Sequence, residues 1–210
     1  MEFSVATRFG KIYLYSLIED APLRIYTTNI NPIDEIKWDQ TSSFMSCFSN
    51  TNIKIFLAFS STPIYEMNEH KKHILCLKWA LRIPEIIQEN GNEHLYINET
   101  VQSVNIPLLV SGSEDTTIKI WDIRDGKCIE DLKQHTSAVT CIDFSHDNKY
   151  MCSGGEDRVI NVYHMGKRRI IWTLKVGNSI DELGWSFDDN YIAVSFKRNL
   201  MVIDAKLIKD

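Results

Sequence analysis

Ser111, Asp115 and His135 carry the hydroxyl, carboxylate and imidazole groups that serine hydrolases use as nucleophile, orienting acid and general base. The first two lie in the stretch SGSEDTTIKIWD. A serine and an aspartate recur at the same spacing in Ser153 and Asp157. Because an enzyme normally needs only one such set, the recurrence favours a structural hydrogen-bond network over a catalytic triad. We therefore expect no catalytic residue in the chain.

His70 and His73 are the next pair to consider, as possible metal ligands. They have no acidic or thiol partner at the spacing of a zinc site, and the sequence contains no glycine-rich phosphate loop. The cysteines are odd in number and form no CxxC pair, which favours buried, reduced thiols in an intracellular protein. We expect no metal and no cofactor. The cysteines are Cys47, Cys76, Cys128, Cys141 and Cys152.

The composition narrows the class of partner. The formal net charge is −5, which argues against a surface that binds nucleic acid or anionic membranes. No apolar run approaches the roughly 20 residues of a membrane span, and the start MEFSVATRFG does not resemble a signal peptide. With 44% hydrophobic residues, the chain should be globular. We expect no direct sequence-specific binding to nucleic acid and no membrane association.

The elements that would position these groups recur along the chain. Ser153 follows Ser111 by 42 residues, and Ser195 follows Ser153 by another 42. Each unit alternates short apolar runs, rich in Val, Ile, Tyr and Trp, with polar turns such as SHDNK, which is the pattern of β-hairpins. Four short strands in about 42 residues is typical of a β-propeller blade. An apolar element ahead of the serines ends at Trp38, Trp79, Phe144 and Trp185.

These units resemble WD repeats of the WD40 β-propeller family. In that family a His before the first strand, a Ser or Thr on the second, an Asp in the next turn and a Trp on the third form a structural tetrad. The resemblance assigns a complete tetrad to His70, Ser111, Asp115 and Trp121. A second tetrad, with tyrosine in place of tryptophan, is His135, Ser153, Asp157 and Tyr163. Weaker matches are Asn29, Ser46, Asn50 and Phe56 in an earlier unit and Ser195 in the last.

We expect an all-β fold, an incomplete WD40 propeller of about four and a half blades, each a four-stranded antiparallel sheet. The first blade should lack its first strand, and the last blade its fourth. Because propellers close into rings that leave no open sheet edge, we expect the C-terminal part of a longer seven- or eight-bladed protein, or a shortened gene product. A five-bladed ring is the less favoured alternative. The expected blades are 1–28, 29–68, 69–133, 134–176 and 177–210.

An insertion at 82–107 separates the first and second strands of the third blade. Its glutamates, prolines and asparagines predict a surface loop, in which IPEIIQE would form a short helical turn. A loop of this length either contacts a partner or is solvated decoration. We keep both interpretations open.

The rim of the central channel is the place where a bound peptide is expected. By resemblance to other propellers, the third residue after a tetrad histidine often lines that rim. Here it is His73 in one blade and Ala138 in the next, with Lys71 close by. The alternative is that these are ordinary exposed loop positions.

Three segments resemble the transducin β-like (Sif2-type) subunits of histone-deacetylase corepressor complexes. The resemblance implies a non-catalytic nuclear scaffold that binds other proteins or peptides within a multi-subunit complex. Alternatives are a WD-repeat adaptor in RNA processing, ribosome biogenesis or ubiquitin ligation and, less favoured, a propeller hydrolase. The segments are HILCLKW with its insertion and LLVSGSEDTTIKIWDIRDGKCIEDLKQH, AVTCIDFSHDNKYMCSGGEDRVINVYHMGKRRIIWTL, and SIDELGWSFDDNYIAVSFKRNLMVIDAK.

Overall fold

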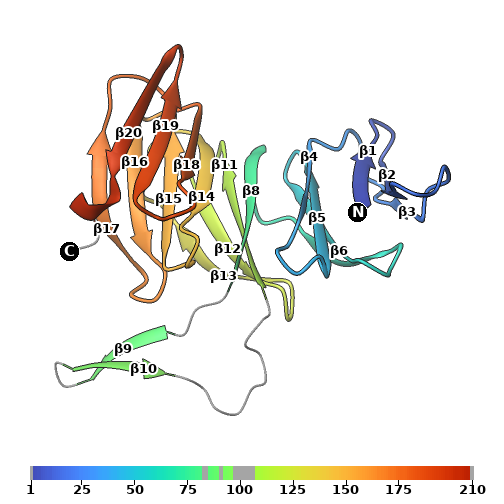
Figure 1. Ribbon diagram of the computed structural model, residues 1–210, viewed down its shortest axis with the longest axis horizontal. Coiled ribbons are helices and arrows are strands. Elements are labelled where there is room, and N and C mark those ends of the chain that lie inside the picture. Colours follow the sequence, from blue (N-terminus) through green and yellow to red (C-terminus); the bar gives the residue numbers. More distant parts are fainter. Residues whose placement is uncertain (1, 82–84, 90–91, 97–106, 209–210) are drawn as a thin grey trace.

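A computed structural model describes residues 2–81, 85–89, 92–96 and 107–208 of the chain. Within those residues the fold is all-β and consists of antiparallel sheets that follow one another along the molecule, as an incomplete WD40 propeller should (Figure 1). The predicted fold class is confirmed. None of the helices in this part of the chain is long and apolar enough to cross a membrane.

The outer two of the five larger sheets have three strands each. The first sheet is β1 (Glu2–Ala6), β2 (Lys11–Ser16) and β3 (Arg24–Thr27). The fifth sheet is β18 (Glu182–Trp185), β19 (Tyr191–Phe196) and β20 (Asn199–Asp204), which a short 3-10 helix, η1 (Ala205–Leu207), follows.

The three sheets between them have four strands each. The second is β4 (Glu35–Trp38), β5 (Phe44–Ser49), β6 (Asn52–Leu57) and β7 (Pro63–Met67). The third is β8 (Ile74–Leu81), β11 (Pro107–Ser113), β12 (Ile118–Asp122) and β13 (Lys127–Leu132). The fourth is β14 (Val139–Phe144), β15 (Tyr150–Gly155), β16 (Val159–His164) and β17 (Arg169–Lys175).

The described residues of the insertion form a separate two-stranded sheet (Figure 1). Its strands are β9 (Glu85–Glu89) and β10 (Asn92–Tyr96), paired in antiparallel register. The expected helical turn in IPEIIQE is therefore wrong. In the sequence, Asn90-Gly91 separates the two strands, and Asn-Gly between strand-forming runs is a strong β-hairpin signal, so this stretch forms cross-strand pairs instead of a helical turn.

Each of the three four-stranded sheets packs through one face against the sheet before it and through the other against the sheet after it. Four clusters of buried side chains fill the spaces between consecutive sheets, because alternate residues along a strand point to opposite faces. Strands β4, β8, β14 and β18, the first strands of their sheets, contact one another in that order.

Tryptophan side chains also link neighbouring sheets. The indole N–H of Trp38 donates to Ser4 Oγ in the first sheet at 2.9 Å, and that of Trp79 donates to the carbonyl of Lys37 in the second sheet at 3.1 Å. Asn148 accepts from the amide of Leu81 at 2.9 Å, at the root of the insertion. Buried polar groups at the interfaces are thus paired across sheets.

Candidate functional site

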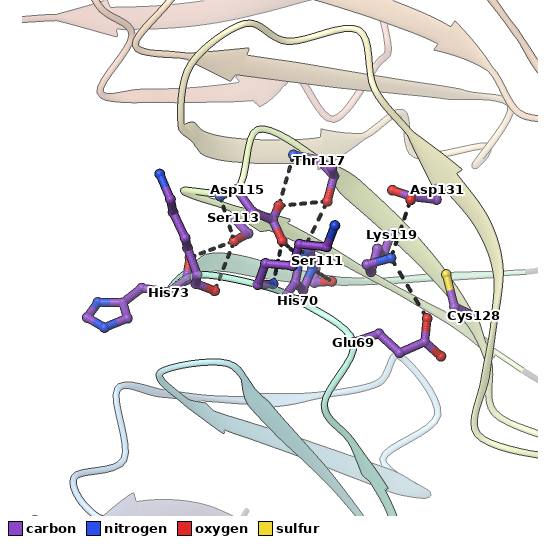
Figure 2. A network of polar contacts seen from close by, with 12 residues as sticks. Glu69, His70, His73, Ser111, Ser113, Asp115, Thr117, Lys119, Cys128 and Asp131 are labelled. Carbon is purple, nitrogen blue, oxygen red and sulfur yellow. Dashed lines mark hydrogen bonds and ion pairs between the residues drawn. The ribbon is translucent and has the colours of Figure 1, made fainter.

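The third sheet brings four residues from separate elements into one chain of hydrogen bonds. His70 precedes β8, Ser111 lies in β11, Asp115 in the following turn and Trp121 in β12. His70 Nδ1 lies 2.9 Å from Asp115 Oδ2 and His70 Nε2 lies 2.7 Å from Ser111 Oγ, while the Trp121 indole donates to Ser111 Oγ at 2.9 Å. Figure 2 shows the Asp115, His70 and Ser111 part of this network.

Asp115 also fixes the turn in which it lies. Its carboxylate accepts the amide N–H of Lys71 at 2.8 Å and both the amide and hydroxyl of Thr117, at 3.0 and 2.7 Å. Ser113 Oγ accepts the amide of Asp115 and donates to the carbonyl of His73 at 2.8 Å. The carboxylate of Asp115 and the hydroxyl of Ser113 therefore tie the loop before β8 to the turn between β11 and β12, together with a backbone bond from the Glu114 amide to the His73 carbonyl at 2.9 Å.

The charges in this network follow from burial and hydrogen bonding. Burial lowers the pKa of His70, an effect that Asp115 opposes and Lys119 reinforces, so the imidazole is neutral at pH 7. Burial alone would raise the pKa of Asp115, but hydrogen bonds from Thr117, Lys71 and His70 outweigh it and hold that pKa well below its usual range. A neutral imidazole donates from Nδ1 to the carboxylate and accepts the Ser111 hydroxyl at Nε2.

The arrangement of Asp115, His70 and Ser111 resembles the relay of a serine hydrolase, but its environment differs. The Ser111 side chain is fully buried, at 0% exposure, and His70 is only 4% exposed. The Ser111 hydroxyl already donates to the His70 imidazole and accepts from the Trp121 indole, which leaves no approach for a substrate carbonyl. The network holds the blade together.

The fourth sheet repeats the arrangement with one difference. His135 Nδ1 lies 2.9 Å from Asp157 Oδ2, and His135 Nε2 lies 2.9 Å from Ser153 Oγ. Tyr163 pairs with Met151 in strand register, but its hydroxyl donates to Glu130 Oε1 in the third sheet at 2.6 Å.

Tyr163 therefore does not take over the tryptophan's bond to the serine, as the tetrad assignment implied. A phenol carries its donor at the far end of the ring, so it reaches the next sheet instead. Asn161 Nδ2 lies 3.4 Å from His135 Nε2, on the same side as Ser153. Burial, together with Glu130, raises the pKa of Tyr163.

Strand register corrects the serine assigned to the second sheet. Cys47, paired with Lys54, takes the place that Ser111, paired with Lys119, has in the third sheet. Ser46 lies on the opposite face, because the β5–β6 hairpin is one residue shorter than the β11–β12 hairpin. The Cys47 thiol is buried, and burial raises its pKa to about 12. It is a core residue.

The fifth sheet has the same one-residue difference. Val194, paired with Met201, occupies the tetrad-serine position and is fully buried. Ser195 lies on the other face, where its hydroxyl donates to the carbonyl of its strand partner Glu182 at 3.4 Å. The even spacing of 42 residues thus coincides with structure only between the third and fourth sheets.

A buried lysine next to the tetrad was not anticipated from the sequence. Lys119 is 8% exposed, and its ammonium lies 3.5 Å from Asp131 and 3.8 Å from Glu69 (Figure 2). Lys54 is buried in the same way in the second sheet and pairs with Glu66 at 3.2 Å. The signal was the recurrence of IKIF and IKIW, which places a lysine between apolar residues on a buried strand.

The three candidate rim residues differ in accessibility. Lys71 and His73 are exposed beside the tetrad turn, and Figure 2 shows the His73 ring pointing away from the network. Ala138 is only 7% exposed, so its side chain has almost no surface to offer a partner. Of the three candidates, only Lys71 and His73 therefore have exposed side chains.

The cysteines and other residue types that bind metals form no further site among the residues that the structure describes. All five cysteines are free thiols, buried or half-buried. Among the residues that the structure describes, no three His, Cys, Asp or Glu side chains are grouped so as to hold a metal ion.

The sequence is similar to known proteins along its whole length. The family described as "WD domain, G-beta repeat" matches residues 92–122 and 126–164. WD40 repeat-containing protein HOS15 of Arabidopsis thaliana is 28% identical over 209 residues, 99% of this chain and 32% of that protein. Transducin beta-like protein 3 of Rattus norvegicus is 30% identical over 109 residues, 49% of this chain and 14% of that protein.

A third relative matches a larger share of the chain than transducin beta-like protein 3 does, but a smaller share than HOS15. Nuclear distribution protein PAC1 of Zygosaccharomyces rouxii is 21% identical over 172 residues, 76% of this chain and 34% of that protein. The chain thus spans about a third or less of the length of the relatives it matches.

Proposed function

Since the chain contains WD repeats, we propose that it is a non-catalytic scaffold that presents propeller surfaces to other proteins or peptides. The observation that carries this proposal is the burial of the groups best suited to chemistry. Ser111 and Ser153 are at most 2% exposed and are committed to hydrogen bonds inside the sheets. The propeller hydrolase alternative is disfavoured for the same reason.

The specific form of the proposal is a nuclear subunit of a histone-deacetylase corepressor complex. It rests on the three segments that resemble transducin β-like subunits and on similarity over 99% of the chain to a WD40 repeat-containing protein. The alternative is a WD-repeat adaptor in another assembly. Similarity to a nuclear distribution protein supports this adaptor alternative, because WD repeats occur in proteins of unrelated complexes.

Within this proposal, Lys71 and His73 form part of the partner-binding rim. Both side chains are exposed, while the backbone that carries them is fixed by Asp115 and Ser113. A rigid backbone with exposed polar side chains lowers the entropic cost of binding a peptide. The rim is favourable for a ligand that accepts hydrogen bonds or carries negative charge.

The test is affinity purification of the tagged chain from nuclear extract, with deacetylase activity measured in the eluate. We expect activity to copurify with the wild type and to fall at least fivefold with Lys71→Glu/His73→Ala. The matched control, Lys127→Glu/His146→Ala, changes the same residue types at exposed positions elsewhere, at the start of β13 and in the turn after β14, and should copurify activity normally. Copurified proteins without deacetylase activity would favour the adaptor, and equal activity in both variants would exclude this rim.

A further inference from the structure

The turn between β6 and β7 of the second sheet carries a threonine that is followed directly by a proline. Thr62 and Pro63 form the one Ser-Pro or Thr-Pro dipeptide in the sequence. A serine or threonine with proline as its next residue is the sequence that proline-directed protein kinases phosphorylate. The Thr62 side chain is exposed, so it is open to such an enzyme.

The fold places this dipeptide at the outer edge of a sheet. Strand β7 is the last strand of its sheet and pairs on one side only, with β6. Pro63 is the first residue of β7, and the Thr62 hydroxyl lies 3.3 Å from Ser60 Oγ within the turn. An exposed turn beside an edge strand opens locally at low free energy, so a kinase can extend the chain around Thr62.

A guanidinium without a carboxylate partner lies at the same turn. Arg24, in β3 of the first sheet, donates to the carbonyl of Phe59, which precedes Thr62 in the turn. Among the residues that the structure describes, no carboxylate lies within ion-pair distance of Arg24. The corresponding turn of the third sheet differs, because Arg124 Nε there donates to the Asp122 carboxylate at 3.0 Å. The turn of the second sheet therefore has the cation of such a pair but not the anion.

We propose that Thr62 is a phosphorylation site for a proline-directed kinase and that Arg24 binds the phosphate. In the transfer, Thr62 Oγ bonds to the γ-phosphorus of MgATP while the bond from that phosphorus to the ADP oxygen breaks. The hydroxyl proton passes to the catalytic base of the kinase. The phosphate adds a charge of about −1.5 to −2 at pH 7 and accepts charge-assisted hydrogen bonds from a guanidinium.

The phosphate would strengthen the junction between the first and second sheets. Arg24 belongs to the first sheet, and the Tyr26 hydroxyl of that sheet already donates to the carbonyl of Ala58, in the same turn, at 2.7 Å. A phosphate on Thr62 would add an ion pair beside this hydrogen bond. The inference does not depend on the proposed scaffold function.

Treatment of the purified chain with a recombinant proline-directed kinase and MgATP tests the proposal. Intact mass should show one phosphoryl group per chain, and peptide mapping should place it on Thr62. Thr62→Ala removes the acceptor and Pro63→Ala removes the recognised neighbour, so both should prevent incorporation. The matched control, Ser61→Ala, removes an adjacent exposed hydroxyl that no proline follows and should react like the wild type. No incorporation into the wild type, or equal incorporation into Thr62→Ala or Pro63→Ala, overturns the proposal.

A rate comparison tests whether the fold presents Thr62 to the kinase. A synthetic peptide of residues 55–68 serves as the unfolded substrate. We expect kcat/KM for the folded chain to lie within about tenfold of the value for the peptide, because the turn opens easily. A larger deficit in the folded chain overturns the proposal.

Thermal melts test the assignment of Arg24. Phosphorylation should raise the Tm of the wild type by about 2 °C or more. Arg24→Gln keeps an amide donor but no charge, so phosphorylation should leave its Tm unchanged. An unchanged Tm in the phosphorylated wild type, or an equal rise in Arg24→Gln, overturns the pairing of Arg24 with the phosphate.

Discussion

Removal of the Asp115 carboxylate should destabilise the chain without abolishing any chemistry. The carboxylate accepts four hydrogen bonds, from His70, the amide of Lys71, and the amide and hydroxyl of Thr117. In Asp115→Ala, the exposed Lys71 amide and the Thr117 hydroxyl can turn to water. The His70 N–H, on a ring with 0% side-chain exposure, and the half-buried Thr117 amide cannot do so easily.

The expected magnitude follows from these two donors. A hydrogen bond to a charged group contributes about 1.5–3 kcal/mol, and an unpaired buried donor costs about 1–3 kcal/mol. Two such losses, partly relieved by relaxation, give about 2–4 kcal/mol of unfolding free energy. For a chain of this length each kcal/mol lowers Tm by about 2–4 °C. Asp115→Asn keeps one carbonyl oxygen as acceptor and should lose about half as much.

Thermal melts followed by circular dichroism provide the assay. The control is Asp20→Ala, an exposed aspartate outside the tetrads, which should change stability by less than about 0.5 kcal/mol. Asp188 is also exposed but is not neutral, because its carboxylate accepts hydrogen bonds from Ser186 at 2.6 Å and Asn190 at 2.7 Å. Equal Tm values for Asp115→Ala and Asp20→Ala would falsify the stabilising role of the tetrad.

Three further predictions concern the insertion, pH and a turn. Replacing 82–106 with a four-residue turn should leave Tm within a few degrees of the wild-type value in a melting experiment. Leu81 and Pro107 are already strand partners, and loop-closure entropy changes slowly with length. Loss of soluble protein would contradict this prediction. Folding lowers the pKa of His70, so the stability that comes from its neutral form should be present above the unfolded pKa of about 6.5 and should decline as pH falls below that value. Urea titrations at pH 7.5 and 5.5 should show this decline in the wild type. The decline should be smaller in His70→Asn. Gly126→Ala should cost at least about 1 kcal/mol in the same urea assay, because Gly126 has φ +70° and an added Cβ would lie 2.5 Å from a tyrosine ring. Gly177→Ala, where an added Cβ meets nothing within 4 Å, should be nearly neutral.

The fold was accessible from the sequence because short apolar, strand-forming runs alternate with polar turns along the chain. In β12, for instance, IKIWD follows the polar turn EDTT, and the same order recurs in neighbouring sheets. The tetrad of the third sheet was accessible for a related reason. Its members lie at the spacing that the WD-repeat resemblance assigns to them, and the hydrogen bonds join those four residues.

The two misplaced serines share one physical cause, which is that strand register is set by hairpin length and not by residue spacing along the chain. A hairpin that is one residue shorter moves Cys47 into the place expected for Ser46 and Val194 into that of Ser195. In Tyr163 the residue lies at the expected position, but the donor sits at the end of the ring and finds Glu130. Residue type alone did not give the direction of that bond.

The direction of the tryptophan bonds has a consequence for synthesis on the ribosome. Trp38 and Trp79 each donate to a sheet that precedes them in the chain, so the acceptor has already emerged when the indole does. Each new sheet can therefore dock on a finished one, at a translation rate of about 5–20 residues per second. An apolar sheet face stays exposed only until the ribosome has synthesised the next repeat, which shortens the time during which a nascent chain can aggregate.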